Sequence, residues 1–154
     1  MNNITRFASA ALMVLTASTA QASGEARVEV RGGINWASAF GITVSEEFLG
    51  LGAGYDFDIG KNTFIGPEVS AEKFLVDGSD IQWSVGGRAG AKLGDATRLY
   101  AAAGLTFVAG DSSPYAGVGV QQSFGRSFYG RVEYRRYFDV IDSNVAGLAF
   151  GLTF

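Results

Sequence analysis

The segment from Phe128 to Phe138 reads FYGRVEYRRYF, and charged and apolar side chains alternate along it. Arg131, Glu133 and Arg135 occupy every second position, and mostly apolar side chains lie between them. A period of two is typical of a β-strand whose two faces meet different surroundings. The segment therefore predicts a strand with one ionic face and one apolar face.

The same alternation recurs along the chain, between short clusters of Gly, Asp, Ser and Asn that predict turns. We expect eight strands, over residues 26–36, 49–57, 63–75, 81–93, 97–109, 115–124, 128–138 and 144–154. Their length suits tilted strands that cross a bilayer, for which about 9 to 11 residues suffice, whereas strands of soluble proteins usually have about five or six. Pro67 lacks a donor for the ladder and predicts a bulge or local irregularity.

The two parities of these segments differ in chemistry. One parity is apolar, and its only charges, Lys73 and Arg136, lie near strand ends. The apolar set includes Val28, Val30, Ile34, Trp36, Leu49, Leu51, Tyr55, Phe57, Ile81, Trp83, Val85, Leu93, Leu99, Leu105, Phe107, Val118, Val120, Phe124, Phe128, Val132, Tyr134, Phe138, Leu148, Phe150, Leu152 and Phe154. The opposite parity carries Arg27, Glu29, Arg31, Asp56, Glu68, Glu72, Arg88, Lys92, Arg98, Arg131, Glu133 and Arg135, with Tyr100, Tyr115, Tyr129 and Tyr137.

The N-terminal residues have a different pattern. A short polar start with one positive charge, Met1 to Arg6, precedes the apolar run 7–15 and small residues that end in Ala20-Gln21-Ala22. This is the layout of a secretory signal peptide with an A-x-A cleavage site. The apolar run is shorter than the roughly 20 residues that a membrane-spanning helix needs. We expect residues 1–22 to be cleaved and residues 23–154 to form one domain.

An apolar face opposite an ionic face fits two architectures. The ionic face could be the solvent side of a soluble sandwich, but the long strands and the secretion signal disagree with that reading. In hydrocarbon, every backbone polar group must find a partner within the protein, so a secreted all-β chain with an apolar face must close on itself. We therefore expect an all-β fold, an eight-stranded antiparallel transmembrane up-and-down β-barrel (a meander), with the charged residues in its lumen.

Aromatic residues gather near the ends of the expected strands. If the N-terminus lies in the periplasm, Tyr55, Phe57, Phe124, Phe128 and Phe154 fall at the lower rim. Trp36, Trp83, Phe107 and Phe138 then fall at the upper rim. Two aromatic girdles are what anchoring at the two interfaces of a membrane predicts.

The final expected strand, Asn144 to Phe154, reads NVAGLAFGLTF and places Leu148, Phe150, Leu152 and Phe154 on one face. This end resembles the C-terminal assembly signal that bacterial outer-membrane barrels present to their insertion machinery. With eight strands and a signal peptide, residues 23–154 resemble the small OmpA/OmpX/opacity-type barrel superfamily. The resemblance implies a protein of the Gram-negative outer membrane, in contact with lipid and lipopolysaccharide and assembled by the barrel-assembly machinery. The peptidoglycan-binding domain of full OmpA proteins is expected to be absent.

The expected outer loops cover residues 37–48, 76–80, 110–114 and 139–143, and only the first is long enough to form a distinct binding surface. Their charged residues are all acidic: Glu46, Glu47, Asp77, Asp80, Asp111, Asp139 and Asp142. Such a rim could bridge to lipopolysaccharide phosphates through divalent cations, since these prefer oxygen ligands. More often, carboxylates in such positions only solvate turns.

Composition excludes several functions. The chain has no cysteine, so a disulfide framework and a lipid-modified N-terminal cysteine are both excluded. Its 12 basic and 15 acidic residues form no basic cluster, which argues against nucleic acid as a partner. The chain also has no histidine, whereas outer-membrane barrel enzymes, such as those that modify lipid A, resemble one another in needing one as a base or to activate water. We expect no enzyme and no cofactor.

Two functional hypotheses remain, an envelope-structural or surface-interaction role and, as the alternative, a narrow porin-like channel. Eight strands enclose an interior only just wide enough for side chains to fill. In such a barrel the third and seventh strands lie opposite each other, so Glu68 and Glu72 should meet Arg131 and Arg135 across the lumen. Glycines of the inward parity should make room for the long side chains: Gly50, Gly52, Gly54, Gly117, Gly119, Gly147 and Gly151. The sequence thus favours a salt-bridge plug over a wide pore.

Overall fold

The computed structural model describes residues 24–39, 42–139 and 142–154. The expected signal peptide, residues 1–22, lies outside the described residues. The described chain forms eight strands: β1 (Gly24–Ala39), β2 (Ile42–Ile59), β3 (Thr63–Phe74), β4 (Ile81–Leu93), β5 (Thr97–Val108), β6 (Asp111–Phe124), β7 (Phe128–Tyr137) and β8 (Ser143–Thr153).

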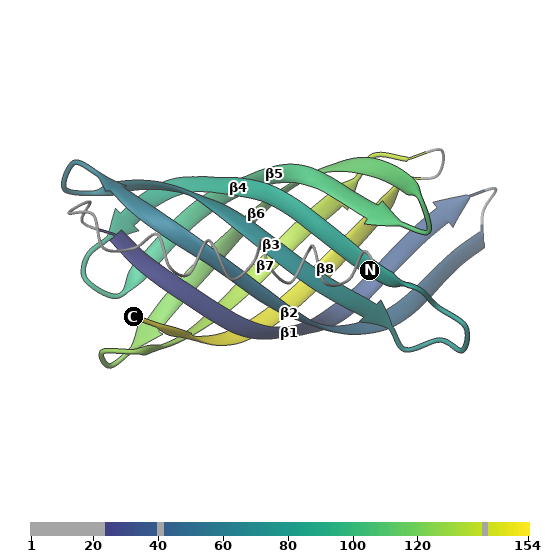
Figure 1. Ribbon diagram of the computed structural model, residues 1–154, viewed down its shortest axis with the longest axis horizontal. Helices are drawn as coiled ribbons and strands as arrows, with labels where there is room; N and C mark the ends of the chain where they lie inside the picture. Colours follow the sequence, from purple (N-terminus) through teal and green to yellow (C-terminus); the bar gives the residue numbers. More distant parts are fainter. Residues whose placement is uncertain (1–23, 40–41, 140–141) are drawn as a thin grey trace, which may run out of the picture.

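The strands follow one another around a closed barrel (Figure 1). Every neighbouring pair is antiparallel, and β1 pairs with β8 from Arg27↔Thr153 to Ala37↔Ser143, which completes the ring. The predicted eight-stranded meander is therefore confirmed. Within the part of the chain that the structure describes, there is no helix of the length and apolar character needed to cross a membrane.

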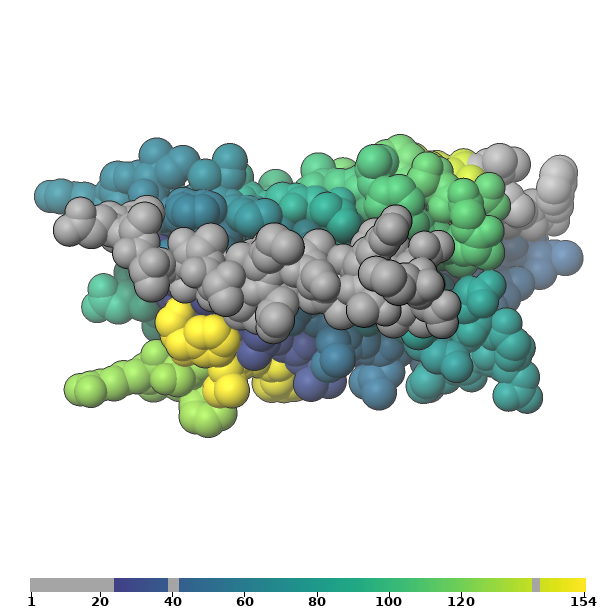
Figure 2. Space-filling model, in the orientation of Figure 1, coloured from purple at the N-terminus to yellow at the C-terminus, as the bar shows by residue number. Residues whose placement is uncertain are grey.

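The two ends of the barrel differ in their connections (Figure 1). One end, here called the terminal end, holds the start of β1, the end of β8 and three tight turns. Gly60, Gly94 and Gly125 adopt positive φ angles of 76°, 75° and 73° in these turns, a backbone conformation that favours glycine. Figure 2 shows the β6–β7 turn and the yellow end of β8 toward the same end of the molecule. The opposite end, here called the mouth, holds the four connections β1–β2, β3–β4, β5–β6 and β7–β8.

The two faces of the barrel wall have opposite chemistry, as the alternation predicted. Leu51 and Phe150 on the outer face are 63% and 67% exposed, whereas Arg88 and Arg135 on the inner face are each 1% exposed. A charged side chain can be buried here because the barrel places it in the lumen, away from the apolar outer surface. The interior of this protein therefore holds buried charges, together with aromatic residues such as Phe48 and Phe64, and its surface is apolar, which is the arrangement of a membrane barrel.

The prediction of a long loop at residues 37–48 is wrong. β1 and β2 continue toward the mouth, with Ala37 paired to Val44 and Ser38 to Thr43, and the hydroxyls of Ser38 and Thr43 lie 2.9 Å apart. The run Ile42 to Val44 is β-branched, which favours strand. Hydrogen bonding to β1 therefore extends the hairpin beyond the expected strand ends.

Two other sequence expectations change in detail. The β5–β6 connection is a two-residue turn, Ala109-Gly110, with φ angles of 49° and 99°, so β6 begins at Asp111 rather than after residue 114. Pro67 causes no bulge. The β2–β3 ladder has a gap between Gly54↔Glu68 and Phe57↔Ile65 and resumes in the same register, so only a local irregularity is present.

Candidate functional site

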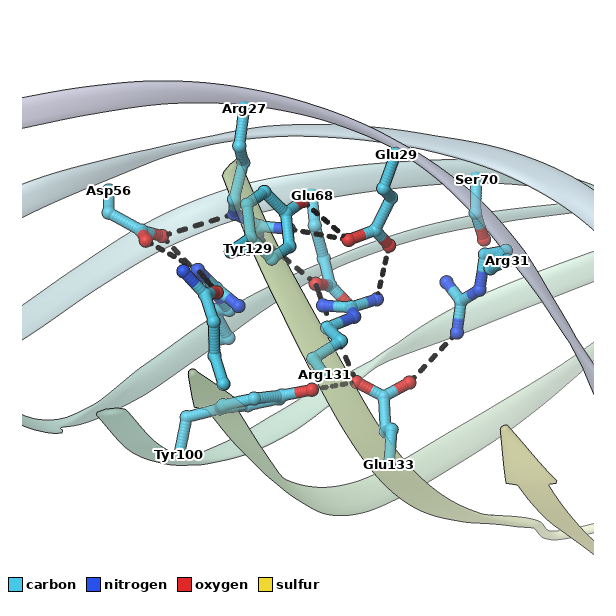
Figure 3. A network of polar contacts seen from close by, with 12 residues as sticks. Arg27, Glu29, Arg31, Asp56, Glu68, Ser70, Tyr100, Tyr129, Arg131 and Glu133 are labelled. Carbon is cyan, nitrogen blue, oxygen red and sulfur yellow. Dashed lines mark hydrogen bonds and ion pairs between the residues drawn. The ribbon is translucent and has the colours of Figure 1, made fainter. Parts of the chain in front are cut away.

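The lumen of the barrel is occupied by ion pairs between strands that are distant in the sequence (Figure 3). Glu68, on β3, lies at the centre. Its carboxylate is within 3.2 Å of Arg27, 3.6 Å of Arg131 and 2.9 Å of Arg135, and the Tyr115 hydroxyl donates to it at 3.4 Å. The structure thus brings β3 and β7 together across the lumen, with β1 contributing the third arginine.

Two further carboxylates sit beside this centre, as Figure 3 shows. Glu133 is 2.8 Å from Arg31, forms a close ion pair with Arg135, and accepts a hydrogen bond from the Tyr100 hydroxyl at 2.5 Å. Glu29 lies 2.5 Å from Arg131 and accepts from the Tyr129 hydroxyl at 2.6 Å. Three of the four inward tyrosines, Tyr100, Tyr115 and Tyr129, therefore donate hydrogen bonds to buried carboxylates.

Glu72 and the arginines around it form the layer of ion pairs nearest the mouth. Glu72 is 3.1 Å from Arg31 and 3.8 Å from Arg135, and the Ser70 hydroxyl donates to it at 3.2 Å. Each arginine of this layer also contacts Glu133. Glu72 and Glu133 are thus linked through shared arginines rather than standing as separate pairs.

Asp56, on β2, forms the layer toward the terminal end. It accepts two hydrogen bonds from Arg88, at 3.0 and 2.5 Å, and lies 3.2 Å from Arg98 and 3.5 Å from Arg27. The Arg88 guanidinium also donates to the Gln121 amide oxygen at 2.9 Å and lies over the Tyr100 ring at 4.8 Å. Such a bidentate pair is among the stronger charge-assisted interactions.

Two acidic members of the network were missed from the sequence. Glu25 lies 2.5 Å from Arg98, and Asp58 lies 2.6 Å from Lys92, both in partly exposed pairs at the terminal end. Both residues share the inward parity of their strands, so extending the alternation to the true strand ends would have found them. With them, the ion pairs of the inward face join seven acidic and seven basic residues. Gln121, which is fully buried, was also missed because an amide carries no charge to reveal it.

Glycines of the inward face make room for this packing. A Cβ on Gly54 would come within 2.6 Å of the Arg27 guanidinium, and one on Gly52 within 2.8 Å of the Glu29 carboxylate. At Gly119 it would meet the Tyr100 ring. The inner wall is therefore shaped around its charged and aromatic side chains, which fill the centre of the lumen.

The outer face carries the aromatic residues that the sequence assigned to two girdles. Trp83 pairs in register with Phe107, and the Trp36 and Tyr134 rings lie 6.3 Å apart, on strands toward the mouth. Phe138, at the mouth, is 45% exposed. Toward the terminal end, the Tyr55 and Phe57 rings lie 4.6 Å apart, and Phe124 pairs in register with Phe128.

The last strand presents its apolar side chains outward. Leu148, Phe150, Leu152 and Phe154 are 55%, 67%, 40% and 66% exposed. Phe154 also exchanges two backbone hydrogen bonds with Ala26, at 2.9 and 3.0 Å, and so continues the seam between β8 and β1. The terminal residue thus combines an exposed aromatic side chain with a paired backbone.

The mouth contains a pocket of about 350 Å³ above the ion pairs, here called the mouth pocket. It is lined by residues of seven strands and two connections: Asn35, Phe74, Gln82, Thr106, Val108, Ala109, Asp111, Ser113, Tyr137, Asp139 and Ser143. Ser113 donates to Asp139 at 2.9 Å. No lysine or arginine is among these lining residues, so the pocket is acidic. Across the described chain, no three Asp or Glu residues converge as a metal-binding group.

Comparisons with known proteins agree with this architecture. Residues 7–154 match a family model described as the outer membrane protein beta-barrel domain. Solved structures similar to this chain include Ail, the attachment invasion locus protein of Yersinia pestis. It is 14% identical, with 85% of this chain and 99% of that chain covered and a TM-score of 0.62.

Two other solved structures are similar. Neisserial surface protein A is 16% identical, with 84% and 97% of the two chains covered and a TM-score of 0.58. The N-terminal barrel domain of Pseudomonas aeruginosa OprF is 15% identical, with 87% and 100% covered and a TM-score of 0.62. At these identities the likeness shows the fold alone. A search of curated protein sequences returns no match.

The family match covers nearly the whole chain, and the closed barrel, apolar outer face and ionic lumen are all features of membrane barrels. The protein resides in the outer membrane of a Gram-negative bacterium. The chain belongs to the outer-membrane protein β-barrel domain family.

Proposed function

We propose that this protein is a non-enzymatic outer-membrane barrel whose plugged lumen serves envelope structure and presents the mouth for interactions at the cell surface. The observation that carries the proposal is the position of Glu68, which joins arginines of β1 and β7 across the middle of the lumen. A pathway for solutes would have to break several buried ion pairs, and separating such a pair costs several kcal/mol. The ion pairs therefore support a fixed plug over a channel.

The chemistry of the outer face is suited to contact with lipid and, toward the mouth, with lipopolysaccharide. Its apolar side chains are widely exposed, and this surface is stable only when hydrocarbon covers it. The exposed side chains of β8, including Phe154, support recognition by the barrel-assembly machinery during insertion.

The charge around the mouth bears on which class of surface partner this protein could bind. The solved Ail complex holds sucrose octasulfate, an analogue of heparin and therefore a polyanion. Among the residues that the structure describes near the mouth, the acidic ones are Glu46, Glu47, Asp77, Asp80, Asp111, Asp139 and Asp142, and only Lys73 and Arg136 oppose them. Arg136 is in turn paired with Asp142 at 2.6 Å. A mouth of this charge would repel a polyanion such as heparin.

Planar-bilayer conductance of the refolded barrel tests the plug. The expected result is an inserted protein that gives no stable single-channel step, with a known porin in the same bilayer as the positive control. Insertion is checked separately by heat-modifiable migration of the recovered protein. A stable step of several hundred picosiemens would show an open path and favour the narrow channel instead.

A further inference from the structure

We propose that the mouth pocket binds a small organic cation, an ammonium or guanidinium group carried on an aliphatic stem. This inference deepens the surface role proposed above and rests on it. The pocket opens at the mouth, above the closed ion-pair layers, and its volume of about 350 Å³ corresponds to roughly ten water molecules. A guanidinium with a short stem fits within that space.

The charged groups of the pocket are all acceptors. The carboxylates of Asp111 and Asp139 accept hydrogen bonds only, and no basic side chain lines the pocket. The side-chain oxygen of Asn35 is buried and has no hydrogen-bond partner within the described residues. A ligand with several N–H donors and a positive charge complements this set, whereas an anion would be repelled.

Tyr137 is the second observation that points to a ligand. Its side chain lines the pocket, the residue is only 6% exposed, and its hydroxyl, which lies beside Arg135, makes no hydrogen bond of good geometry among the residues that the structure describes. Burying an unpartnered hydroxyl has a free-energy cost that a bound polar group would remove. The rings of Tyr137 and Phe74 also give the pocket aromatic walls, which attract cations.

The surrounding charges favour the same ligand class. Arg135, two residues before Tyr137, lies on the lumen side of the pocket. Its charge is already neutralised by Glu68, Glu72 and Glu133. The acidic residues around the mouth add a negative field that raises the local concentration of cations. A dedicated metal site is disfavoured, because only two carboxylates line the pocket and no metal-binding group of three is found among the described residues.

The test is titration of the refolded, detergent-solubilised barrel with agmatine and, separately, with a tripeptide that has arginine at its centre. The same tripeptide with citrulline is the uncharged control. We expect saturable binding of at least one cationic probe, and weakening by about tenfold in Asp139→Asn and in Asp111→Asn, since one charge-assisted hydrogen bond contributes about that factor. Amide shifts in an NMR titration should centre on Asn35, Ser113 and Tyr137.

Asp77→Asn is the matched control, because Asp77 is an exposed acidic residue of the mouth that does not line the pocket. It removes the same charge and should change the affinity less than twofold. Agmatine binding assigns the site to free cations, and binding of the arginine peptide alone assigns it to a partner's side chain. The inference is overturned if neither probe binds or if the citrulline peptide binds as tightly as the arginine peptide. It is also overturned if Asp77→Asn weakens binding as much as Asp139→Asn, or if Mg²⁺ alone displaces the probe at matched ionic strength. A barrel that conducts yet binds agmatine would refute the plug and leave this inference standing.

Discussion

The carboxylate of Glu68 on β3 lies 2.9 Å from the guanidinium of Arg135 on β7, although these strands stand on opposite walls of the barrel. The contact is possible because eight strands enclose a space that side chains can span. Both residues are almost fully buried, so neither charge is stabilised by bulk water. The stability of the barrel should therefore depend on central pairs far more than on pairs at its ends.

Replacement of Glu68 by Gln should destabilise the folded barrel by about 3–5 kcal/mol, because three arginines lose their shared counter-charge while the side-chain shape is kept. Reversible urea unfolding of the lipid-inserted protein measures this free energy, and heat-modifiable migration reports the folded fraction. The matched control is Asp58→Asn, which removes a carboxylate whose pair with Lys92 is partly exposed. That change should cost less than about 1 kcal/mol. Equal losses of unfolding free energy in the two variants would contradict the prediction that Glu68 contributes far more to stability than a carboxylate at the end of the barrel.

Glu72→Gln separates a fixed plug from a gate. Glu72 pairs with Arg31 and Arg135 in the layer nearest the mouth, so neutralising it should lower thermal stability. If the network only fills the barrel, single-channel recordings of the variant should stay as silent as those of the wild type. A reproducible increase in conductance, with little change in melting temperature, would instead identify an exchangeable gate.

Phe154→Asp should lower the amount of protein inserted in the outer membrane and leave its export to the periplasm intact. The substitution keeps the two backbone hydrogen bonds with Ala26 and changes only the exposed side chain. Phe154→Leu, which keeps an apolar side chain, is the control and should insert nearly normally. Cell fractionation with immunodetection measures both variants, and normal membrane levels of the Asp variant would remove the support for an assembly signal.

Gly119→Ala should destabilise the barrel by about 1–3 kcal/mol, the usual cost of overpacking a filled interior. The added Cβ would meet the Tyr100 ring, whose hydroxyl donates to Glu133 at 2.5 Å. Gly147→Ala is a matched control on the same inner face, because its Cβ would find only ordinary contacts, 3.5 Å from the Gly32 carbonyl oxygen and 3.6 Å from the Phe48 ring. Thermal unfolding followed by circular dichroism compares the two. Similar losses at both positions would argue that glycine is needed for strand geometry rather than for space.

The sequence alone determined which side chains face lipid and which face the lumen, because side chains alternate strictly along a strand and burial in hydrocarbon excludes charge. FYGRVEYRRYF in β7 already assigned Arg131, Glu133 and Arg135 to one face, and the structure buries all three. The strand count and closure followed from the same periodicity. The ends of β1 and β2 did not, because Ile42 to Val44 pairs with β1 through backbone hydrogen bonds that side-chain chemistry does not record.

Strand order alone predicted that Glu68 and Glu72 would face Arg131 and Arg135, but only the tertiary structure decided which of the other charges meet. The stagger between neighbouring strands sets the height of each side chain in the lumen, and a parity argument carries no information about height. Glu133 therefore contacts Arg31, which is 102 residues away in the chain, while Lys92 pairs with Asp58 at the terminal end instead of joining the centre. The mouth pocket also depends on tertiary structure. Closure of the barrel brings the first and last strands together, and only then do Asn35, Tyr137 and Asp139 become neighbours.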